Sequence, residues 1–354
     1  MASPEITTAG LIVVKQDPFN AESPLTVQHG IITSTPQFYV RSHFAVPDID
    51  VREWTLHIDG LVATSLKITF QDLLDIPPHR LRATLECAGN GRTAFQPECP
   101  GEPWQYGAVS TAEWTGAPLR TLLERAGIAD EARELVAEGA DRGTVDVRGG
   151  PISFARSVPI KTALHPDTLL AYQMNGEPLT PAHGFPVRLL VPGWYGMASI
   201  KWLTRLTATS DVFDGYYQVD RYVLAYPGVS ETTPLGRMAV RSVIVEPADG
   251  AVVDREETLI RGYAGSGSSP VERVDVSTDG GFSWHEASLT SAPEPYAWRS
   301  WERRWRPERP GEAIISSRAR DAGSEQPSSA PWNQHGYANN AIQSVRVSVK
   351  GEQS

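Results

Sequence analysis

The segment "TLECAGNGR", residues 84–92, places one of the chain's two cysteines between a glutamate and a run of small, turn-forming residues. The Gly-Asn-Gly turn after Cys87 has a permissive backbone, which lets a bulky group approach closely and directs Arg92 back toward the thiol. A cation beside a thiolate lowers the pKa of the thiol and attracts anionic ligands. We therefore expect Cys87 and Arg92 to face the same site.

Four roles are open to Cys87 on this evidence. It can be a small buried apolar side chain, one half of a disulfide with Cys99, a nucleophile activated by a histidine, or a ligand to a soft or high-valent metal completed by a cofactor. The eight histidines are too scattered along the sequence to identify a catalytic base. The composition does not separate the four roles.

The composition is that of a globular protein with two domains. A chain of 354 residues is longer than one domain with a single core usually is. Its contents of hydrophobic residues (40%) and charged residues (21%) indicate neither a disordered nor a fibrous protein. The longest apolar runs fall far short of the roughly 20 residues of a membrane-spanning helix, so we expect no membrane partner. The net charge of -10 argues against a nucleic-acid partner, and any anionic ligand must sit in a local basic pocket.

The first ten residues, "MASPEITTAG", lack the basic and apolar regions of a secretory signal. This start favours a cytoplasmic protein. If a presequence was removed, the location would be periplasmic instead.

The pattern up to about residue 230 predicts a mixed α+β domain. From about residue 37 the sequence gives strand-like runs with Pro and Asp-Gly turns, and strands and turns alternate again over 135–206. Residues 69–77 and 117–128 carry apolar side chains at helical spacing. Asn-Gly at 175–176 signals a hairpin.

Beyond about residue 238 the sequence gives seven or so short alternating strands, parted by Gly, Pro and Asp turns. This pattern predicts an immunoglobulin-like β-sandwich that lacks the cysteine pair of antibody domains. We place the linker at 226–237 and the domains at 1–235 and 236–354.

The segment "AWRSWERRWR", residues 297–306, interleaves aromatic side chains with arginines. Such a pattern can bind single-stranded nucleic acid. The strand-rich context and the acidic chain favour a strand whose Trp298, Trp301 and Trp305 pack in the sandwich or at a subunit contact.

Two motifs carry a resemblance to a known family. "LECAGNGR" (85–92), followed by "HGFPVRLLVPGWYGMASIKWL" (183–203), resembles the molybdenum-binding domain of the sulfite oxidase family. The sandwich after it resembles that family's dimerisation domain, and the resemblance covers about residues 37–350. It implies a mixed α/β molybdopterin-binding domain followed by an immunoglobulin-like dimerisation domain, and therefore a homodimer.

The resemblance also implies the metal site. In the family a cysteine thiolate and the dithiolene of one molybdopterin hold molybdenum, and the matching cysteine is Cys87. Arg92 stands where the motif keeps an arginine near the substrate anion. "FYVRSH" (38–43) resembles the family's F-x-x-R-N-H element, with Ser42 in place of Asn, so Arg41 would reach the substrate or an oxo group and His43 would lie on the pterin side.

Further positions match the family's contacts with the pterin and its phosphate. An Arg fork, a Lys point charge and a close-packed Gly backbone suit a phosphate. The family usually has an arginine where this chain has Ala198, which weakens the expected grip on the phosphate. The remaining cofactor-binding residues that the resemblance implies are Asp141, His183, Arg188, Gly196, Ser199 and Lys201.

Two catalytic positions are matched more loosely. "DGYYQVDRY" (214–222) resembles the segment with the family's active-site tyrosine, which makes Tyr222 the candidate, with Tyr217 or Tyr216 as alternatives. "PWNQHGYANNA" (331–341) resembles the family's W-N-x-R-G segment, but His335 stands at the arginine. An imidazole attracts an anion less than a guanidinium does, so substrate affinity would be lower and more sensitive to pH.

The resemblance implies an enzyme that oxidises sulfite to sulfate by oxygen-atom transfer. The chain has no room for the haem domain of eukaryotic relatives, so the electron acceptor would be external: a cytochrome, oxygen or another carrier. The rival functions are nitrate reduction, sulfoxide reduction and a noncatalytic assembly or binding role. The intact Cys87, Arg92 and Lys201 argue against the last.

Overall fold

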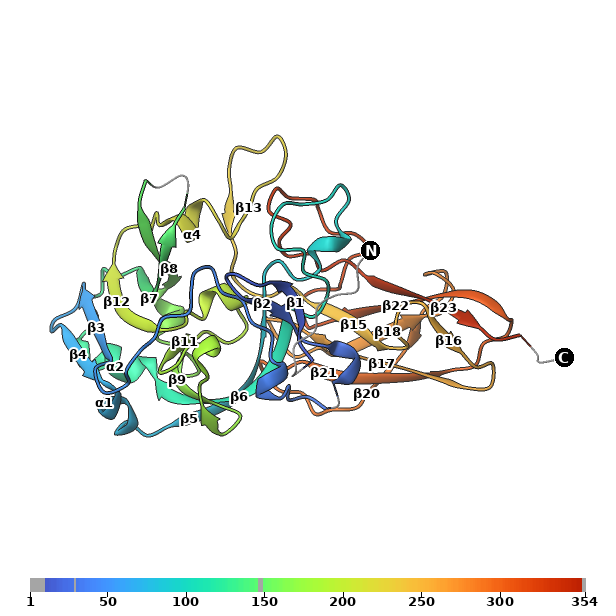
Figure 1. The fold of residues 1–354 in the computed structure, drawn as a ribbon, viewed down its shortest axis with the longest axis horizontal. Helices are drawn as coiled ribbons and strands as arrows, with labels where there is room; N and C mark the ends of the chain where they lie inside the picture. The colour runs from blue at the N-terminus through green and yellow to red at the C-terminus, as the bar shows by residue number, and fades with distance from the viewer. Residues whose placement is uncertain (1–9, 29, 146–148, 352–354) are drawn as a thin grey trace.

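The computed structural model describes residues 10–28, 30–145 and 149–351. It has two lobes, a rounded first lobe and an elongated second one (Figure 1). The strands of the first lobe are β1 (Ile12–Lys15), β2 (Asn20–Glu22), β3 (Thr55–Gly60), β4 (Leu66–Thr69), β5 (His79–Glu86), β6 (Val109–Pro118), β7 (Glu134–Thr144), β8 (Pro151–Pro159), β9 (Leu169–Met174), β10 (Glu177–Pro178), β11 (Arg188–Leu190), β12 (Leu203–Thr209), β13 (Val223–Leu224) and β14 (Thr233–Pro234). Its helices are α1 (Phe70–Leu74), α2 (Leu119–Ala126), α3 (Ile160–Ala163) and α4 (Tyr216–Val219).

Two larger sheets form the body of the first lobe. One has the strand order β4-β3-β12-β7-β8, and the other has the order β10-β9-β6-β5 with β11 paired to β9. The pairing of β12 with β3 is parallel, while the other pairings in these sheets are antiparallel. Apolar side chains of β3, β7, β12 and α2 pack into one core between the elements.

The two main helices are shorter than predicted, for local reasons. Helix α1 begins at Phe70 and is capped by Thr69, whose hydroxyl accepts from the Asp72 N–H (3.2 Å) while the Asp72 carboxylate accepts from the Thr69 N–H (2.8 Å). Helix α2 buries its leucines and ends at Gly127, which has a φ of 69°. Both helices lie inside the ranges predicted from the sequence.

The Asn-Gly hairpin is confirmed. Asn175 and Gly176 have positive φ angles of 55° and 83°, and they connect β9 to β10. Both φ angles suit the tight turn that Asn-Gly favours.

The second lobe is a two-sheet sandwich. Its strands are β15 (Arg241–Glu246), β16 (Ala251–Val253), β17 (Thr258–Gly265), β18 (Arg273–Ser277), β19 (His285–Glu286), β20 (Ser288–Leu289), β21 (Arg299–Trp305), β22 (Gly311–Arg320) and β23 (Gln343–Val349). One sheet has the order β15-β17-β21-β20 and the other β16-β23-β22-β18-β19. Side chains from both sheets share one apolar core, and the two extra strands beyond the predicted seven are the short β19 and β20.

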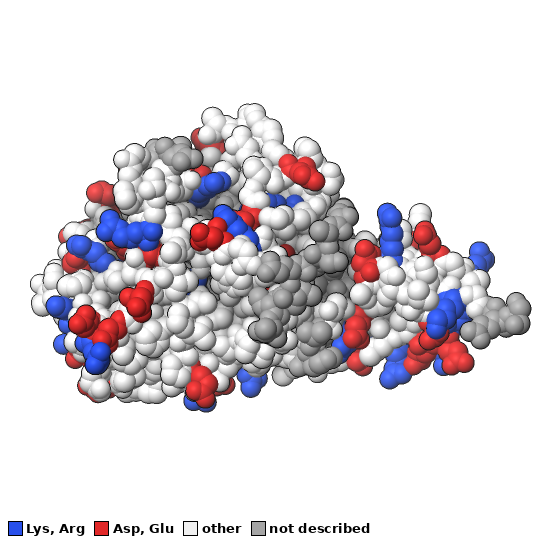
Figure 2. Space-filling view, viewed as in Figure 1, with Lys and Arg blue, Asp and Glu red and all other residues white. Residues whose placement is uncertain are grey.

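The tryptophans of residues 297–306 pack inside the protein. Trp301 is 1% exposed in the sandwich core, and Trp298 stacks on Tyr263 with ring centroids 4.4 Å apart. Trp298 Nε1 donates to the Ile31 carbonyl (2.8 Å), which ties the second lobe to the first. Acidic and basic side chains are interspersed over the face shown in Figure 2.

Some expectations from the sequence need correction. Residues 38–54 form only an isolated bridge at Val40, and the first lobe is richer in strands than a mixed α+β domain. The predicted linker, 226–237, stays a prediction, with the two-residue strand β14 inside it. Among the described residues both cysteines are free, so the Cys87–Cys99 bridge is not formed.

No helix in the described ranges is long and apolar enough to cross a membrane.

Candidate active site

Cys87 begins a tight loop, residues 87–92, at the end of β5. The Cys87 carbonyl accepts from the N–H of Asn90 (2.9 Å), and the Gly89 carbonyl accepts from the N–H of Arg92 (3.0 Å). A Cβ on Gly89 would lie 2.5 Å from Nη2 of Arg92, so only glycine leaves room for the guanidinium there. The loop therefore folds the Arg92 side chain back over Gly89, and Cys87 and Arg92 line one hollow, as the sequence predicted.

The second lobe holds this loop in place. Arg241 on β15 pairs with Glu86 at 2.5 Å, and the two side chains are only 8% and 10% exposed. Nη2 of Arg241 also donates to the Asn90 carbonyl (3.1 Å), and Nδ2 of Asn339 donates to the Gly91 carbonyl (2.9 Å). The position of the Cys87 loop thus depends on contacts from both lobes.

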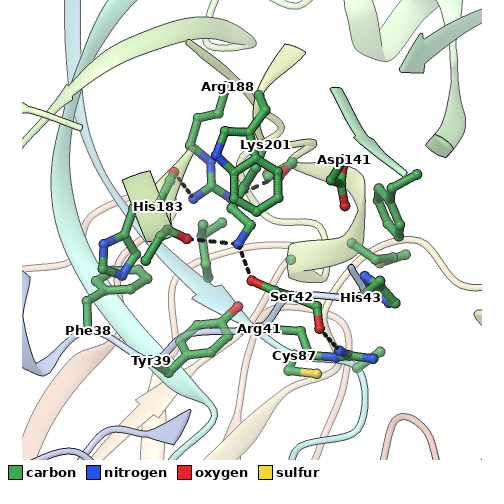
Figure 3. Close-up of a pocket in the computed structure, with 18 of the residues that line it drawn as sticks. Phe38, Tyr39, Arg41, Ser42, His43, Cys87, Asp141, His183, Arg188 and Lys201 are labelled. Atoms are coloured by element: carbon green, nitrogen blue, oxygen red, sulfur yellow. Dashed lines mark hydrogen bonds between the residues drawn. The ribbon is translucent and has the colours of Figure 1, made fainter. Parts of the chain in front are cut away.

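Cys87 lines two hollows. The first, the inner hollow, is lined by residues of the first lobe (Figure 3). Its lining includes every side chain that the resemblance assigned to the cofactor: Arg41, His43, Cys87, Asp141, His183, Arg188, Gly196, Ser199 and Lys201. Segments far apart in the sequence therefore meet at one cavity.

Cations in the inner hollow are held by neutral oxygens. The Arg188 guanidinium donates to the carbonyls of His183 (3.1 Å) and Ser199 (2.9 Å). Nζ of Lys201 donates to the Ser42 hydroxyl (3.0 Å). Within the described part of the chain, neither Arg188 nor Lys201 forms an ion pair. The cavity therefore carries positive charge that no neighbouring carboxylate neutralises directly.

The pKa values in the inner hollow reflect the same excess of cations over carboxylates. Desolvation, then Lys201 and Arg188, lowers the pKa of His183 to about 3, so this imidazole is neutral. Desolvation lowers the pKa of Arg188 to about 10, and desolvation and Arg188 lower that of Lys201. Desolvation also raises the pKa of Asp141 to about 6, against the attraction of Lys201.

Two buried donors or acceptors of the inner hollow lack partners. Nε2 of His183 and Nε of Arg188 have no hydrogen-bond partner among the described residues. Buried polar atoms are almost always paired, because leaving them unpaired is costly. Together with the unneutralised cations, these atoms fit a polar, anionic group such as a pterin with a phosphate.

The thiol of Cys87 differs from our expectation. Burial raises its pKa, and the opposing effects of Arg41, the Gly89 N–H and Arg92 are smaller. Desolvation of the thiolate thus outweighs the neighbouring cations. A metal would reverse this balance, because a coordinating thiol is deprotonated outright.

The second hollow, the outer hollow, shares Cys87 with the first and is lined by residues of both lobes. Its lining includes Arg41, His43, Cys87, Arg92, Glu102, Tyr217, Arg221, Tyr222, His335 and Tyr337. Nε of Arg92 donates to the His335 carbonyl (3.0 Å), which joins the lobes across the hollow. A Cβ on Gly336 would lie 2.8 Å from the Arg92 side chain, so this close approach also requires glycine.

His43 and Tyr222 form a hydrogen-bonded pair where the two hollows meet. Nε2 of His43 lies 2.7 Å from the Tyr222 hydroxyl, and the imidazole stacks on Phe154. Desolvation raises the pKa of Tyr222 and, with Arg41, lowers that of His43, so both are neutral near pH 7. Tyr222 has a φ of 51°, a costly conformation for an aromatic residue that is typical of functional sites.

The predicted site residues therefore come together, with differences in detail. Gly196 leaves space for a neighbouring side chain, since a Cβ there would lie 2.6 Å from the Tyr39 hydroxyl. Ala198 is buried in the apolar core. Of the alternative tyrosines, Tyr217 lines the outer hollow and Tyr216 lines neither hollow.

Sequence reasoning missed several residues of the site. Asn20 accepts from Arg41 (3.3 Å) and from the Ser42 N–H (2.8 Å), although it lies in a segment without a recognisable pattern. Arg221 lines the outer hollow and the Glu86–Arg241 pair supports the Cys87 loop. Only the position of Arg221 directly before the candidate tyrosine was visible in the sequence.

The described residues contain no cluster of three or more His, Cys, Asp or Glu side chains that could hold a metal. A metal at Cys87 would therefore need further ligands from a cofactor. The inner hollow beside Cys87 has polar and cationic lining residues that suit one.

Comparisons with known proteins agree with this arrangement. Residues 43–217 match the oxidoreductase molybdopterin binding domain, and residues 233–350 match the Mo-co oxidoreductase dimerisation domain. Mitochondrial sulfite oxidase of Mus musculus is 36% identical over 98% of this chain and 67% of that protein. Sulfite oxidase of Gallus gallus is 37% identical over 94% of this chain and 76% of that protein.

Other relatives carry different names. Inducible nitrate reductase [NADH] 2 of Glycine max is 35% identical over 95% of this chain and 42% of that protein. The solved sulfane dehydrogenase SoxCD from Paracoccus pantotrophus aligns with a TM-score of 0.81 at 31% identity, over 92% of this chain and 83% of that one. The chain spans about two thirds of the length of the mammalian sulfite oxidases. It belongs to the sulfite oxidase family of molybdopterin oxidoreductases.

Proposed function

We propose that this chain oxidises sulfite to sulfate at a molybdenum centre bound through Cys87 and passes the electrons to an external acceptor. The observation that carries the proposal is the place of Cys87 between two hollows. The inner hollow offers unpaired donors and cations to a cofactor, and the outer hollow offers guanidinium groups to a small anion. Similarity to sulfite oxidases over nearly the whole chain supports the same substrate.

The cofactor would be molybdopterin with molybdenum. Cys87 would supply the protein's thiolate ligand, and Arg188, Lys201 and His183 would hold the polar and anionic groups of the pterin. When bound, the cofactor supplies the two-electron redox change and the exchange of one oxygen atom. The protein supplies position, charge and the handling of protons.

Substrate capture falls to the outer hollow. Sulfite is an anion, and Arg41 and Arg92 would attract it toward Cys87 because the field of cations in a cleft concentrates anions. The overall reaction balances in atoms and in charge when sulfite and one water give sulfate, two protons and two electrons. The two electrons leave with the external acceptor.

Proton release would pass through Tyr222 and His43. The Tyr222 hydroxyl lies at the junction of the two hollows and is hydrogen-bonded to His43 at 2.7 Å. His43 is neutral near pH 7 because desolvation and Arg41 lower its pKa, so it would pass a proton on rather than keep it. The pair thus provides a hydrogen-bonded path for a proton released near Cys87.

Nitrate reduction and oxidation of a sulfane sulfur are the second candidates. Their support is the similarity to a plant nitrate reductase and to a sulfane dehydrogenase. The match to a dimerisation domain supports a homodimer, which we propose as the working assembly.

The test begins with purified protein shown by elemental analysis to contain molybdenum. Sulfite-dependent reduction of ferricyanide, followed by a panel of cytochromes and oxygen, is expected to give turnover. Oxidation of chemically reduced enzyme by nitrate is expected to be slow. Fast nitrate turnover without sulfite oxidation would replace the proposed function with nitrate reduction.

A further inference from the structure

Arg221 is a cation of the outer hollow that the motifs did not indicate. It lies between α4 and β13, directly before Tyr222, and it lines the same hollow as Cys87 and His335. Its Nε donates to the hydroxyl of Tyr216 at 3.1 Å, which fixes the direction of the guanidinium. Arg221 is exposed, so its charge faces the solvent side of the hollow.

The other two guanidinium groups of the outer hollow are engaged by the protein. Arg92 donates to the carbonyls of His335 (3.0 Å) and Glu102 (2.6 Å). Arg41 donates to Asn20 (3.3 Å) and to the carbonyl of Ser42. Arg92 is therefore held through Nε and Nη1, and Arg41 is held through Nη1 alone.

Arg221 keeps more of its hydrogen-bonding capacity. Across the described residues the bond from Nε to the Tyr216 hydroxyl is the only hydrogen bond of its side chain, while its backbone N–H donates to the Tyr216 carbonyl (2.9 Å). Its two terminal nitrogens can therefore grip an oxyanion in the planar, two-point fashion that suits arginine.

The charge balance of the outer hollow favours a doubly charged anion. Three guanidinium groups face one carboxylate, Glu102, which lies 3.6 Å from Lys15 and is partly neutralised by it. Desolvation, then Arg221 and Arg92, lowers the pKa of His335, so this imidazole adds little charge near pH 7. The hollow thus keeps an excess of positive charge with Arg221 at its exposed side.

We propose that Arg221 is the recognition residue that draws a dianionic oxyanion into the outer hollow and sets the preference for sulfite over a monoanion such as nitrate. The proposal rests on the proposed function, and it adds a residue from the first lobe to substrate recognition. Because Arg221 acts on capture rather than on the oxidation step, its loss raises KM and leaves kcat nearly unchanged.

The test compares R221Q with R52Q and R221K. R52Q removes the same charge from an exposed arginine that pairs with Asp50 away from both hollows. R221Q is expected to raise KM for sulfite and the Kd for sulfate about 3- to 10-fold, with kcat within about twofold. R52Q should leave all three unchanged, and R221K should recover most of the affinity because it restores the charge.

Sulfate binding is measured by isothermal titration calorimetry on the oxidised holoenzyme, which separates this inference from the proposed function. Sulfite turnover by the wild type together with unchanged KM and Kd in R221Q would overturn the role of Arg221. A wild type that binds sulfate through Arg221 without oxidising sulfite would overturn the proposed function alone. The salt dependence of kcat/KM should also become shallower in R221Q and not in R52Q.

Discussion

The inner and outer hollows meet at Cys87 but are built in different ways. The inner hollow is lined by the first lobe, and its polar groups are mostly buried, with unpaired atoms on His183 and Arg188. The outer hollow is shared between the lobes, and its cations are held by carbonyls or left exposed, as for Arg221. The first is suited to a group that stays, and the second to an anion that enters and leaves.

This difference explains how one sulfur atom can serve both sides. Cys87, Arg41, His43 and Tyr222 line both hollows. A bound metal at Cys87 would therefore have the pterin on one side and the substrate on the other. Changes in the shared residues should affect both cofactor binding and turnover of substrate. Changes in residues of one hollow alone should affect only one of these.

Replacing Cys87 should have the largest effect. The C87S variant loses the soft thiolate, so turnover of sulfite should fall by at least about a thousandfold while the fold survives. Steady-state assays and circular dichroism check this prediction. A C87S enzyme with full sulfite-dependent activity would remove Cys87 from the metal site.

Breaking the pair that supports the Cys87 loop should destabilise the protein strongly. R241M leaves the buried Glu86 carboxylate without its partner, and such losses cost about 3–5 kcal/mol. The double variant E86M/R241M should recover most of this free energy of unfolding, because no buried charge remains. Denaturant unfolding of the three proteins is the measurement, and equal loss in the single and double variants would refute a charge effect.

Replacing Lys201 should separate the inner hollow from the outer one. K201M should lower the molybdenum content of purified protein, while the thermal stability of the cofactor-free form is retained or raised. The reason is that desolvation and Arg188 lower the pKa of Lys201, so the charge is unfavourable until an anion binds. Because the unfolded state binds this proton more readily, the wild-type cofactor-free form should gain stability as pH rises toward the ordinary lysine pKa, and K201M should not.

His335 should give the smallest effect, confined to the outer hollow. Its pKa is lowered by desolvation, Arg221 and Arg92, so the imidazole gains its charge only as pH falls below the usual histidine range. KM for sulfite in H335Q should match the wild type at pH 8 and exceed it by a few-fold on the acid side. H335R should lower KM at all pH values, and a higher KM in H335R would show that the position does not face the substrate.

The sequence predicted the parts of the molecule that depend on local pattern. Asn175 and Gly176 formed the expected turn, the two helices lay within their predicted ranges, and the alternating strands formed a sandwich. The motif residues around Cys87 and Arg188 were also brought to one cavity. Once the strands are paired, the spacing of these residues within each motif determines which of their side chains face the cavity.

The contacts that depend on long-range packing could not be predicted. Asn20 reaches Arg41 across a segment without periodicity, and Arg241 reaches Glu86 from the other lobe. Burial raises the pKa of Cys87 although cations lie near. The sequence does not show how deeply a side chain is buried, so this shift could not be predicted. Residues 38–54 have a strand-like sequence but form no strand of the main sheets. Arg41, within this segment, lines the inner hollow.

X-ray absorption spectroscopy at the molybdenum edge tests the central claim most directly. Wild-type protein expressed in a host that makes the cofactor should contain molybdenum, with one more sulfur ligand than the C87S variant. Wild-type protein without molybdenum, or the same number of sulfur ligands in both proteins, would contradict the assignment of Cys87 as the ligand between the two hollows.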